Sequence, residues 1–196
     1  MVRMTTFKDW LSFWRFGIKN PFKVGAVLPS SQTLGRAMAQ EIAALPSTGI
    51  IVELGAGTGI VTQALLDAGI HKERLIIIEQ NTDFCALLKK RFPDLQVLCA
   101  DARELESILE ERKNTRVCAI VSSLPLLAMS AEVQAAIMRA SIAVMDEQSL
   151  FVQYTYGLNS PLSKKQIQEL NVLANKAQRI WRNLPPATIW KYQKSM

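Results

Sequence analysis

The stretch "VELGAGTGIVTQALL" (residues 52–66) decides the fold of this chain, because a strand-like apolar run leads through glycines into a helical pattern. Gly55, Gly57 and Gly59 allow a tight turn and a close approach of a ligand to the backbone. Their spacing is G-x-G-x-G, whereas the dinucleotide fingerprint G-x-G-x-x-G requires glycine where this chain has Ile60. The stretch therefore predicts a ligand site between a strand and a helix, and it argues against a nicotinamide dinucleotide.

Acidic residues stand at the ends of the first three predicted strands. Glu53 would repel a pyrophosphate and attract an ammonium group, and Glu79 follows the glycines at the distance suited to accepting ribose hydroxyls. Asp101 is placed to hold an adenine amino group. Each alone is also typical of a solvated turn. Because the carboxyl ends of parallel strands meet at one edge, the three together predict a site for an adenosine that carries an amino acid.

Strands and helices alternate on both sides of this stretch, which predicts an α/β fold with a parallel sheet covered by helices on both faces. The five strands expected first span residues 50–54, 74–79, 95–100, 116–123 and 149–157. Helices are expected over residues 60–68, 82–92, 102–113 and 130–145, with Ser130 as an N-cap. Two further strands on either side of Pro185 and Pro186 predict a closing hairpin and a seven-stranded, mostly parallel sheet.

Composition fits one domain, because the 196 residues are 49% hydrophobic and only 20% charged. The net charge of +6 favours an anionic partner, although plain solubility also explains it. Cys85, Cys99 and Cys118 are expected to be reduced core thiols of a cytosolic protein, and His71 a solvated loop residue. We expect no metal, no secretory signal and no membrane span.

Residues 1–20 predict an amphipathic helix, in which aromatic and aliphatic side chains share one face and cations line its flank. Such a helix either caps the domain core or lies in a membrane interface with its cations over acidic lipids. The residues expected at a membrane or a lipid phosphate are Lys8, Trp10, Trp14, Arg15, Lys19, Lys23, Arg36 and Arg179, with Arg182 as a further candidate. Residues 21–47 are expected to cover the cofactor and substrate, and residues 48–196 to form the core.

The pattern over residues 48–156 resembles the class I methyltransferases, which have a Rossmann-like fold and use S-adenosylmethionine. The resemblance implies that the glycine loop lies beneath the methionine part, that Glu79 holds the ribose and that Asp101 meets the adenine. The implied cofactor residues are Glu53, Gly55, Ala56, Gly57, Gly59, Glu79, Gln80, Asp101, Ala102 and Ser122.

The turn "IVSSLPLL" (residues 120–127) follows the fourth predicted strand. In the resembling rRNA adenine dimethyltransferases an Asn-Leu-Pro-Tyr type turn binds the exocyclic amine and stacks the base. Here Ser123, Leu124 and Pro125 are followed by Leu126, so the stacking aromatic is missing. Base recognition relies on such stacking, worth ~1–3 kcal/mol per base. The turn therefore favours a non-planar amine, with Ser122 and Ser123 orienting the nitrogen and leucines keeping it neutral.

Tyr154 and Tyr156 are two residues apart on the fifth predicted strand and therefore share a face. They either point into the core or hold a methylated ammonium by cation–π attraction, worth ~0.5–2 kcal/mol. The expected catalytic set is Ser122, Ser123, Leu124, Pro125, Tyr154 and Tyr156.

Five ordered blocks resemble a narrower family, the soluble bacterial phospholipid N-methyltransferases: "NPFKVGAVLPSS", "VELGAGTG", "VSSLPLL", "FVQYTYG" and "NLPPATIWKY". The resemblance implies stepwise methylation of phosphatidylethanolamine towards phosphatidylcholine. It also implies a cytoplasmic monomer, bound peripherally to anionic lipids at the inner face of the bacterial membrane, with no stable nucleic-acid partner. The alternatives are an rRNA adenine N6-dimethyltransferase, a small-molecule amine methyltransferase and a non-catalytic protein that binds the cofactor.

Overall fold

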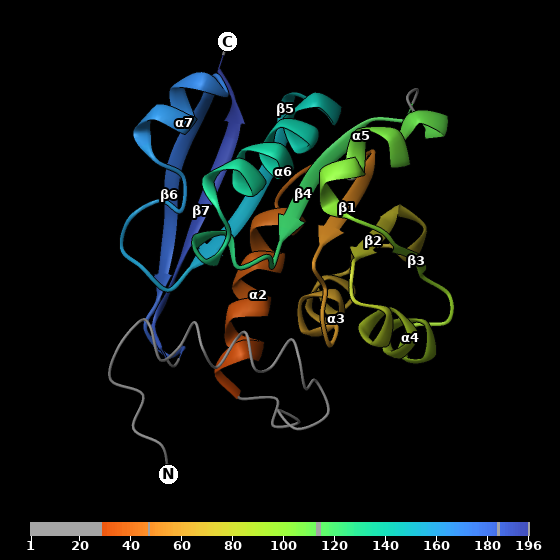
Figure 1. Ribbon diagram of the computed structural model, residues 1–196. Helices are drawn as coiled ribbons and strands as arrows, with labels where there is room; N and C mark the ends of the chain where they lie inside the picture. The colour runs from red at the N-terminus through yellow and green to blue at the C-terminus, as the bar shows by residue number, and fades with distance from the viewer. Residues whose placement is uncertain (1–28, 47, 113–114, 184, 196) are drawn as a thin grey trace.

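The computed structural model describes residues 29–46, 48–112, 115–183 and 185–195. One sheet contains seven strands in the order β3-β2-β1-β4-β5-β7-β6 (Figure 1). The strands are β1 Ile50–Leu54, β2 Leu75–Glu79, β3 Gln96–Cys99, β4 Val117–Ser122, β5 Met145–Thr155, β6 Val172–Ile180 and β7 Ala187–Lys194. This confirms the predicted seven-stranded sheet.

The directions of the strands bring most of their carboxyl ends to one edge of the sheet. The pairs β1–β2, β2–β3, β1–β4 and β4–β5 are parallel, whereas β7 is antiparallel to both β5 and β6. Every strand except β7 therefore ends at the same edge, where Figure 1 shows the arrowheads of β1, β4 and β6. From β1 the chain proceeds outwards to β3 and then returns to β4 on the other side. Sheets of this kind bind ligands at such a switch point, here between β1 and β4.

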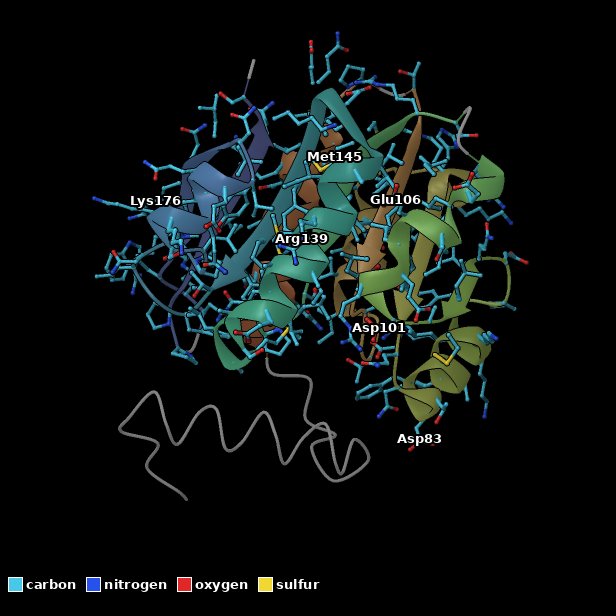
Figure 2. All side chains as sticks on the ribbon, turned by 45° about the horizontal axis from the view of Figure 1, so that its top comes forward. Asp83, Asp101, Glu106, Arg139, Met145 and Lys176 are labelled. Carbon is cyan, nitrogen blue, oxygen red and sulfur yellow. A yellow bond between two sulfur atoms is a disulfide. The ribbon has the colours of Figure 1, made fainter. Side chains whose placement is uncertain are left out.

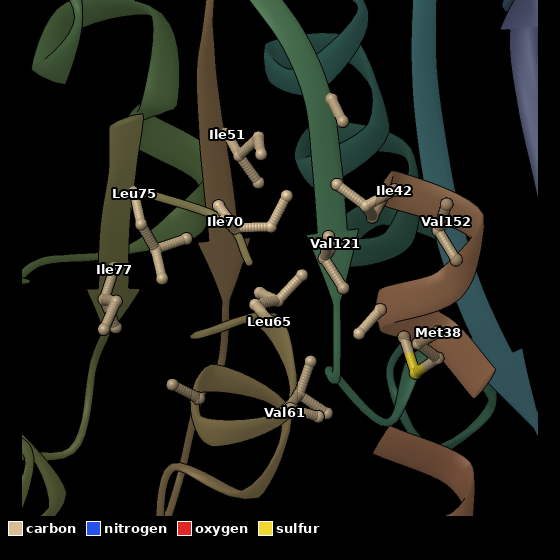
Figure 3. Close-up of a cluster of buried hydrophobic side chains, with 14 of the residues drawn as sticks. Met38, Ile42, Ile51, Val61, Leu65, Ile70, Leu75, Ile77, Val121 and Val152 are labelled. Atoms are coloured by element: carbon tan, nitrogen blue, oxygen red, sulfur yellow. The ribbon is translucent and has the colours of Figure 1, made fainter. Parts of the chain in front are cut away.

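Two helical layers cover the sheet. The helices are α2 Pro29–Ala43, α3 Ile60–Asp67, α4 Thr82–Arg91, α5 Leu105–Ile108, α6 Ala131–Val144 and α7 Lys164–Glu169. Side chains of α2, α3 and α4 pack on one face of the sheet and form the first core with it, and those of α5, α6 and α7 pack on the other face and form the second core. Figure 3 shows the first core, in which Met38 of α2 and Leu65 of α3 lie near Val121 of β4.

A side-chain cap explains where one helix begins, and backbone dihedral angles explain where another predicted helix is interrupted. Ser130 accepts a hydrogen bond from the Val133 backbone and caps α6, as predicted. The continuous helix predicted over residues 102–113 is wrong, since the structure has a 3₁₀ helix Ala102–Glu104, the short α5 and a second 3₁₀ helix Glu110–Arg112. Glu104 departs from helical dihedrals (φ −98°, ψ 13°), which interrupts the helix between the first two pieces.

The prediction of three reduced thiols is wrong for two of them. Cys85 of α4 and Cys99 of β3 form a disulfide, visible as a yellow bond in Figure 2. Packing of α4 beside β3 places their Cα atoms 5.8 Å apart, within the range that a disulfide bridges. Cys118 is free and buried in β4. His71 is exposed before the 3₁₀ helix Lys72–Arg74, as predicted.

The predicted amphipathic helix over residues 1–20 lies outside the described residues, and so do Lys8, Trp10, Trp14, Arg15, Lys19 and Lys23. Within the ranges that the structure describes, none of the helices has both the length and the apolar character needed to cross a bilayer.

Candidate active site

The glycine loop connects β1 to α3 at the switch point. Gly55, Gly57 and Gly59 have φ values of +69°, +55° and +80°, in the left-handed region that strains other residues. A Cβ on Gly59 would lie 2.6 Å from Phe92, whereas a Cβ on Gly57 would meet no atom within 4 Å. Gly57 therefore presents its α-carbon to open space. The Ala56 side chain belongs to the first core, so this residue offers only its backbone to a ligand.

Glu53, fully buried at the end of β1, has one unpaired oxygen. Its Oε2 accepts a 2.7 Å hydrogen bond from Thr62 Oγ1, while Oε1 has no partner within the described part of the chain. Burial raises the pKa of Glu53 to about 7, and the neighbouring charge of Glu79 adds to this against the opposing hydrogen bonds of Thr62. A buried carboxylate with a free oxygen is suited to receive a cation.

Glu79 lies at the end of β2 and is almost completely buried. Its two oxygens accept hydrogen bonds from the Gly57 and Asn81 backbones, each 2.9 Å long. The acid predicted for the ribose therefore also holds the glycine loop. A carboxylate has about four lone-pair sites, so Glu79 retains acceptor capacity for a ligand.

Asp101 follows β3 and lies on the same side of the molecule as Asp83 of α4 (Figure 2). Both of its oxygens accept from the Arg103 side chain, and the shortest of these contacts is 2.6 Å. Hydrogen bonding to Arg103 lowers the pKa of Asp101. Gln80, also predicted, donates to Asp101 over 3.1 Å, and the Ala102 side chain lies in the second core. Arg103 was not among the predicted site residues, although a cation two residues after a site aspartate is a visible signal.

The turn after β4 lies directly over the glycine loop. The Ser123 backbone donates to the Leu54 carbonyl over 2.9 Å, and the buried Ser122 hydroxyl accepts from the Leu124 backbone over 3.4 Å. Pro125 precedes the 3₁₀ helix Leu126–Ala128. The Ser123 hydroxyl is buried and has no hydrogen-bond partner among the described residues. Leu124 is partly buried, whereas Leu126 lies in the second core, so Leu126 is not one of the leucines that can surround the amine.

Two glutamines that were not among the predicted site residues hold this turn. Gln153 of β5 donates from Nε2 to the Leu124 carbonyl over 3.0 Å, and Gln134 of α6 donates to the Leu126 carbonyl over 2.6 Å. Gln153 lies opposite Ser122 in the pairing of β4 with β5. The signal for it was a polar residue inside the apolar strand "LFVQYT", because an amide is rarely buried without a partner.

Tyr154 and Tyr156 share a face, as predicted, with ring centroids 5.3 Å apart in an edge-to-face arrangement. Both rings pack against the first core, on the α2 side of the sheet. Burial raises the pKa of Tyr154 well above its usual value and that of Tyr156 to about 12. Both hydroxyls therefore stay protonated near neutral pH and cannot act as bases.

The predicted phosphate ligands lie apart from one another in sequence and on different elements. Arg36 is exposed on α2, whereas Arg179 at the end of β6 donates to Thr188 and lies over the Trp181 ring, 4.6 Å from its centroid. Arg182 is exposed in the connection from β6 to β7.

Comparison with known proteins identifies the family, although no family model matches the chain. The ornithine lipid N-methyltransferase of Singulisphaera acidiphila is 32% identical over 152 residues, which cover 76% of this chain and 78% of that enzyme. The chain belongs to the same family of class I S-adenosylmethionine-dependent methyltransferases. A segment of only 44 residues of the present chain is also 46% identical to the ribosomal RNA small subunit methyltransferase A of a Synechococcus strain.

Solved structures show the same fold at low sequence identity. The N-methyltransferase NodS of Bradyrhizobium japonicum, solved with S-adenosylhomocysteine, superposes with a TM-score of 0.68 at 10% identity and covers 95% of this chain and 98% of its own. The 1,6-didemethyltoxoflavin N1-methyltransferase of Burkholderia thailandensis gives a TM-score of 0.63 at 12% identity, covering 96% and 87%. The cofactor of this methyltransferase is S-adenosylmethionine, and the unpaired Glu53 oxygen and the open space at Gly57 suit its amino acid part.

Proposed function

We propose that this methyltransferase N-methylates phosphatidylethanolamine, stepwise towards phosphatidylcholine, at a membrane surface. The main support is the turn after β4, where an unpaired serine hydroxyl and Leu124 adjoin the cofactor loop, while the position of the base-stacking aromatic is taken by Leu126, which is buried in the second core. A related enzyme is an ornithine lipid N-methyltransferase, so an amine on a lipid is a substrate within the family.

The turn would prepare the amine for attack. The bound cofactor supplies a methyl group on a sulfonium sulfur. The neutral amine nitrogen forms a bond to that methyl carbon while the carbon–sulfur electrons return to sulfur, and the resulting ammonium loses its proton to water before the next methylation. Apolar surroundings such as Leu124 disfavour the ammonium form and so help to keep the amine neutral. Ser122 and Ser123 orient it, which is catalysis by positioning.

The tyrosine pair is proposed to receive the positive charge that methylation builds. Ser122 of β4 pairs with Gln153 of β5, and Tyr154 and Tyr156 come shortly after Gln153 along the chain. Both tyrosines therefore lie at the same edge of the sheet as Ser122. The face of an aromatic ring attracts a methylated ammonium by ~0.5–2 kcal/mol, which is the role proposed for this edge-to-face pair.

Exposed apolar side chains at the site edge support membrane association. Leu127, Leu158 and Trp181 follow the carboxyl ends of β4, β5 and β6, and they are 40%, 62% and 72% exposed. Arg179 and Arg182 lie beside Trp181, and Arg36 is exposed on α2; these cations are the described candidates for lipid phosphate. An aromatic ring among cations at the mouth of a site suits an anionic lipid surface. The proposed membrane helix over residues 1–20 would add to this anchor.

The lipid amine of ornithine lipid is a second candidate substrate, favoured by the 32% identity to the Singulisphaera enzyme. The two are separated by measuring kcat/KM with vesicles that carry either lipid in the same anionic matrix. We expect a higher kcat/KM for phosphatidylethanolamine, with its mono- and dimethyl forms as products. A higher value for ornithine lipid would overturn the proposed substrate and leave the lipid N-methyltransferase assignment in place.

A further inference from the structure

The two glutamines that hold the turn after β4 use their amides differently. Gln134 is satisfied at both ends, because its Nε2 donates to the Leu126 carbonyl and its Oε1 accepts from Gln166 over 3.1 Å. Gln153 donates twice from Nε2, to the carbonyls of Leu124 and Tyr154, over 3.0 and 2.7 Å. Its Oε1 is buried and has no partner in the part of the chain that the structure describes.

The orientation of the Gln153 amide is fixed by its neighbours. The group that meets two carbonyl oxygens must be the NH₂ end, because a carbonyl there would face two acceptors without a hydrogen. Flipping the amide would therefore lose both hydrogen bonds. The position of the unpaired Gln153 oxygen beside the turn is therefore fixed, on a side chain that is only 1% exposed.

The turn carbonyl that this amide holds, that of Leu124, is already occupied. Leu124 O accepts from Gln153 Nε2 and also from the Leu126 backbone over 2.9 Å, which uses both of its lone pairs. By contrast, Gln153 Oε1 and the Ser123 hydroxyl each lack a donor in the described structure. These two side-chain oxygens are therefore available to accept an incoming N–H at this turn.

We propose that Gln153 Oε1, together with the Ser123 hydroxyl, accepts the N–H bonds of the substrate amine and aims its lone pair at the methyl group. This inference rests on the proposed function and assigns Gln153 as a substrate-orienting residue. It has a distinctive consequence, because the number of N–H bonds on the neutral amine falls with each methylation. Phosphatidylethanolamine has two, its monomethyl form has one, and its dimethyl form has none for Gln153 to accept.

The test compares kcat/KM for these three lipids, in vesicles of one composition, between the wild type and Gln153→Met. We expect the variant to show a uniform loss on all three lipids from the missing clamp, and a further loss of about tenfold on phosphatidylethanolamine relative to the dimethyl lipid, the effect of one hydrogen bond of ~1.4 kcal/mol. Gln134→Met is the matched control, because Gln134 also holds the turn but has no unpaired oxygen. It should lower kcat/KM for all three lipids by the same factor. Calorimetric affinity for S-adenosylhomocysteine should be unchanged in both variants.

If Gln153→Met does not fold, Ser123→Ala removes the other proposed acceptor and leaves the Gln153 clamp in place, and it should lower kcat/KM on phosphatidylethanolamine relative to the dimethyl lipid. An equal loss on all three lipids in Gln153→Met, or in Ser123→Ala, would overturn the proposed orienting role and leave the proposed function in place. A wild-type enzyme that methylates none of the three lipids would overturn the proposed function as well.

Discussion

Leu124 packs against Gly55 so closely that a Cβ added to Gly55 would lie 2.5 Å from Leu124 Cδ2. One residue belongs to the turn after β4, proposed for the substrate, and the other to the cofactor loop after β1. The contact joins the two halves of the site into one packed unit, and its geometry excludes any side chain at position 55.

Gly55→Ala should therefore destabilise the protein in two ways. Its φ of +69° strains alanine by ~1–2 kcal/mol, and the clash with Leu124 adds ~1–3 kcal/mol of overpacking. In a Leu124→Ala background only the backbone strain remains. Denaturant unfolding of the four proteins in this double-mutant cycle should give a coupling of ~1–2 kcal/mol. Additive losses would show that the contact does not exist in solution.

Gly57→Ala should lower cofactor affinity without a packing defect. A Cβ there meets no atom within 4 Å, so only the strain of φ +55° remains, about 1 kcal/mol. Gly69 is a matched control, because it has φ +85° and equally open space but follows α3 at the opposite edge of the sheet. Both variants should lose similar stability, whereas calorimetry should show weaker S-adenosylhomocysteine binding for Gly57→Ala alone. Equal affinities would remove Gly57 from the cofactor site.

The titration of Glu53 should make stability pH-dependent. Its pKa rises from 4.5 to about 7 on folding, so the folded state binds more protons between these values and stability falls as pH rises through this window. Above pH 7 the loss is complete and amounts to about 3 kcal/mol. Glu53→Gln should remove this dependence, and its stability relative to the wild type should rise from pH 4.5 to pH 7. Parallel unfolding profiles for the two proteins would contradict the buried titration.

The same carboxyl group should control cofactor affinity. Only the ionised form attracts the amino group of S-adenosylhomocysteine, so affinity should rise as pH increases through about 7 and then level off. Glu53→Gln should bind more weakly, by about tenfold or more, with a flat profile. Calorimetric titrations from pH 6 to 8 check this, and a flat wild-type profile would show that Glu53 does not meet the cofactor ammonium.

Apolar side chains at the site edge should contribute to membrane binding. Trp181→Ala combined with Leu158→Ser should lower the bound fraction in flotation with anionic vesicles by several-fold, because each removes apolar surface that enters the interface. Leu173→Ser is the control, since this leucine is 52% exposed but lies at the other end of β6. Equal effects of both changes would indicate nonspecific adhesion.

Sequence patterns predicted the fold and the position of two acidic residues beside the glycine loop, because strand ends and glycine turns are local features with a strong physical meaning. Glu53 and Glu79 lie beside the glycine loop as expected, since parallel strands bring their ends to one edge. The disulfide was missed because it depends on how α4 packs on β3, which spacing does not reveal. Gln153 was missed for a similar reason, since one of its two partners, the Leu124 carbonyl, belongs to a turn 29 positions away.

The most direct test of the central claim is to incubate the protein with methyl-labelled S-adenosylmethionine and, separately, phosphatidylethanolamine vesicles and undermodified ribosomal subunits. The proposed function predicts label in the lipid fraction, in mono- and dimethylated forms, and none in RNA. Label in RNA alone would contradict it and support the rRNA enzyme to which a short segment of this chain is similar.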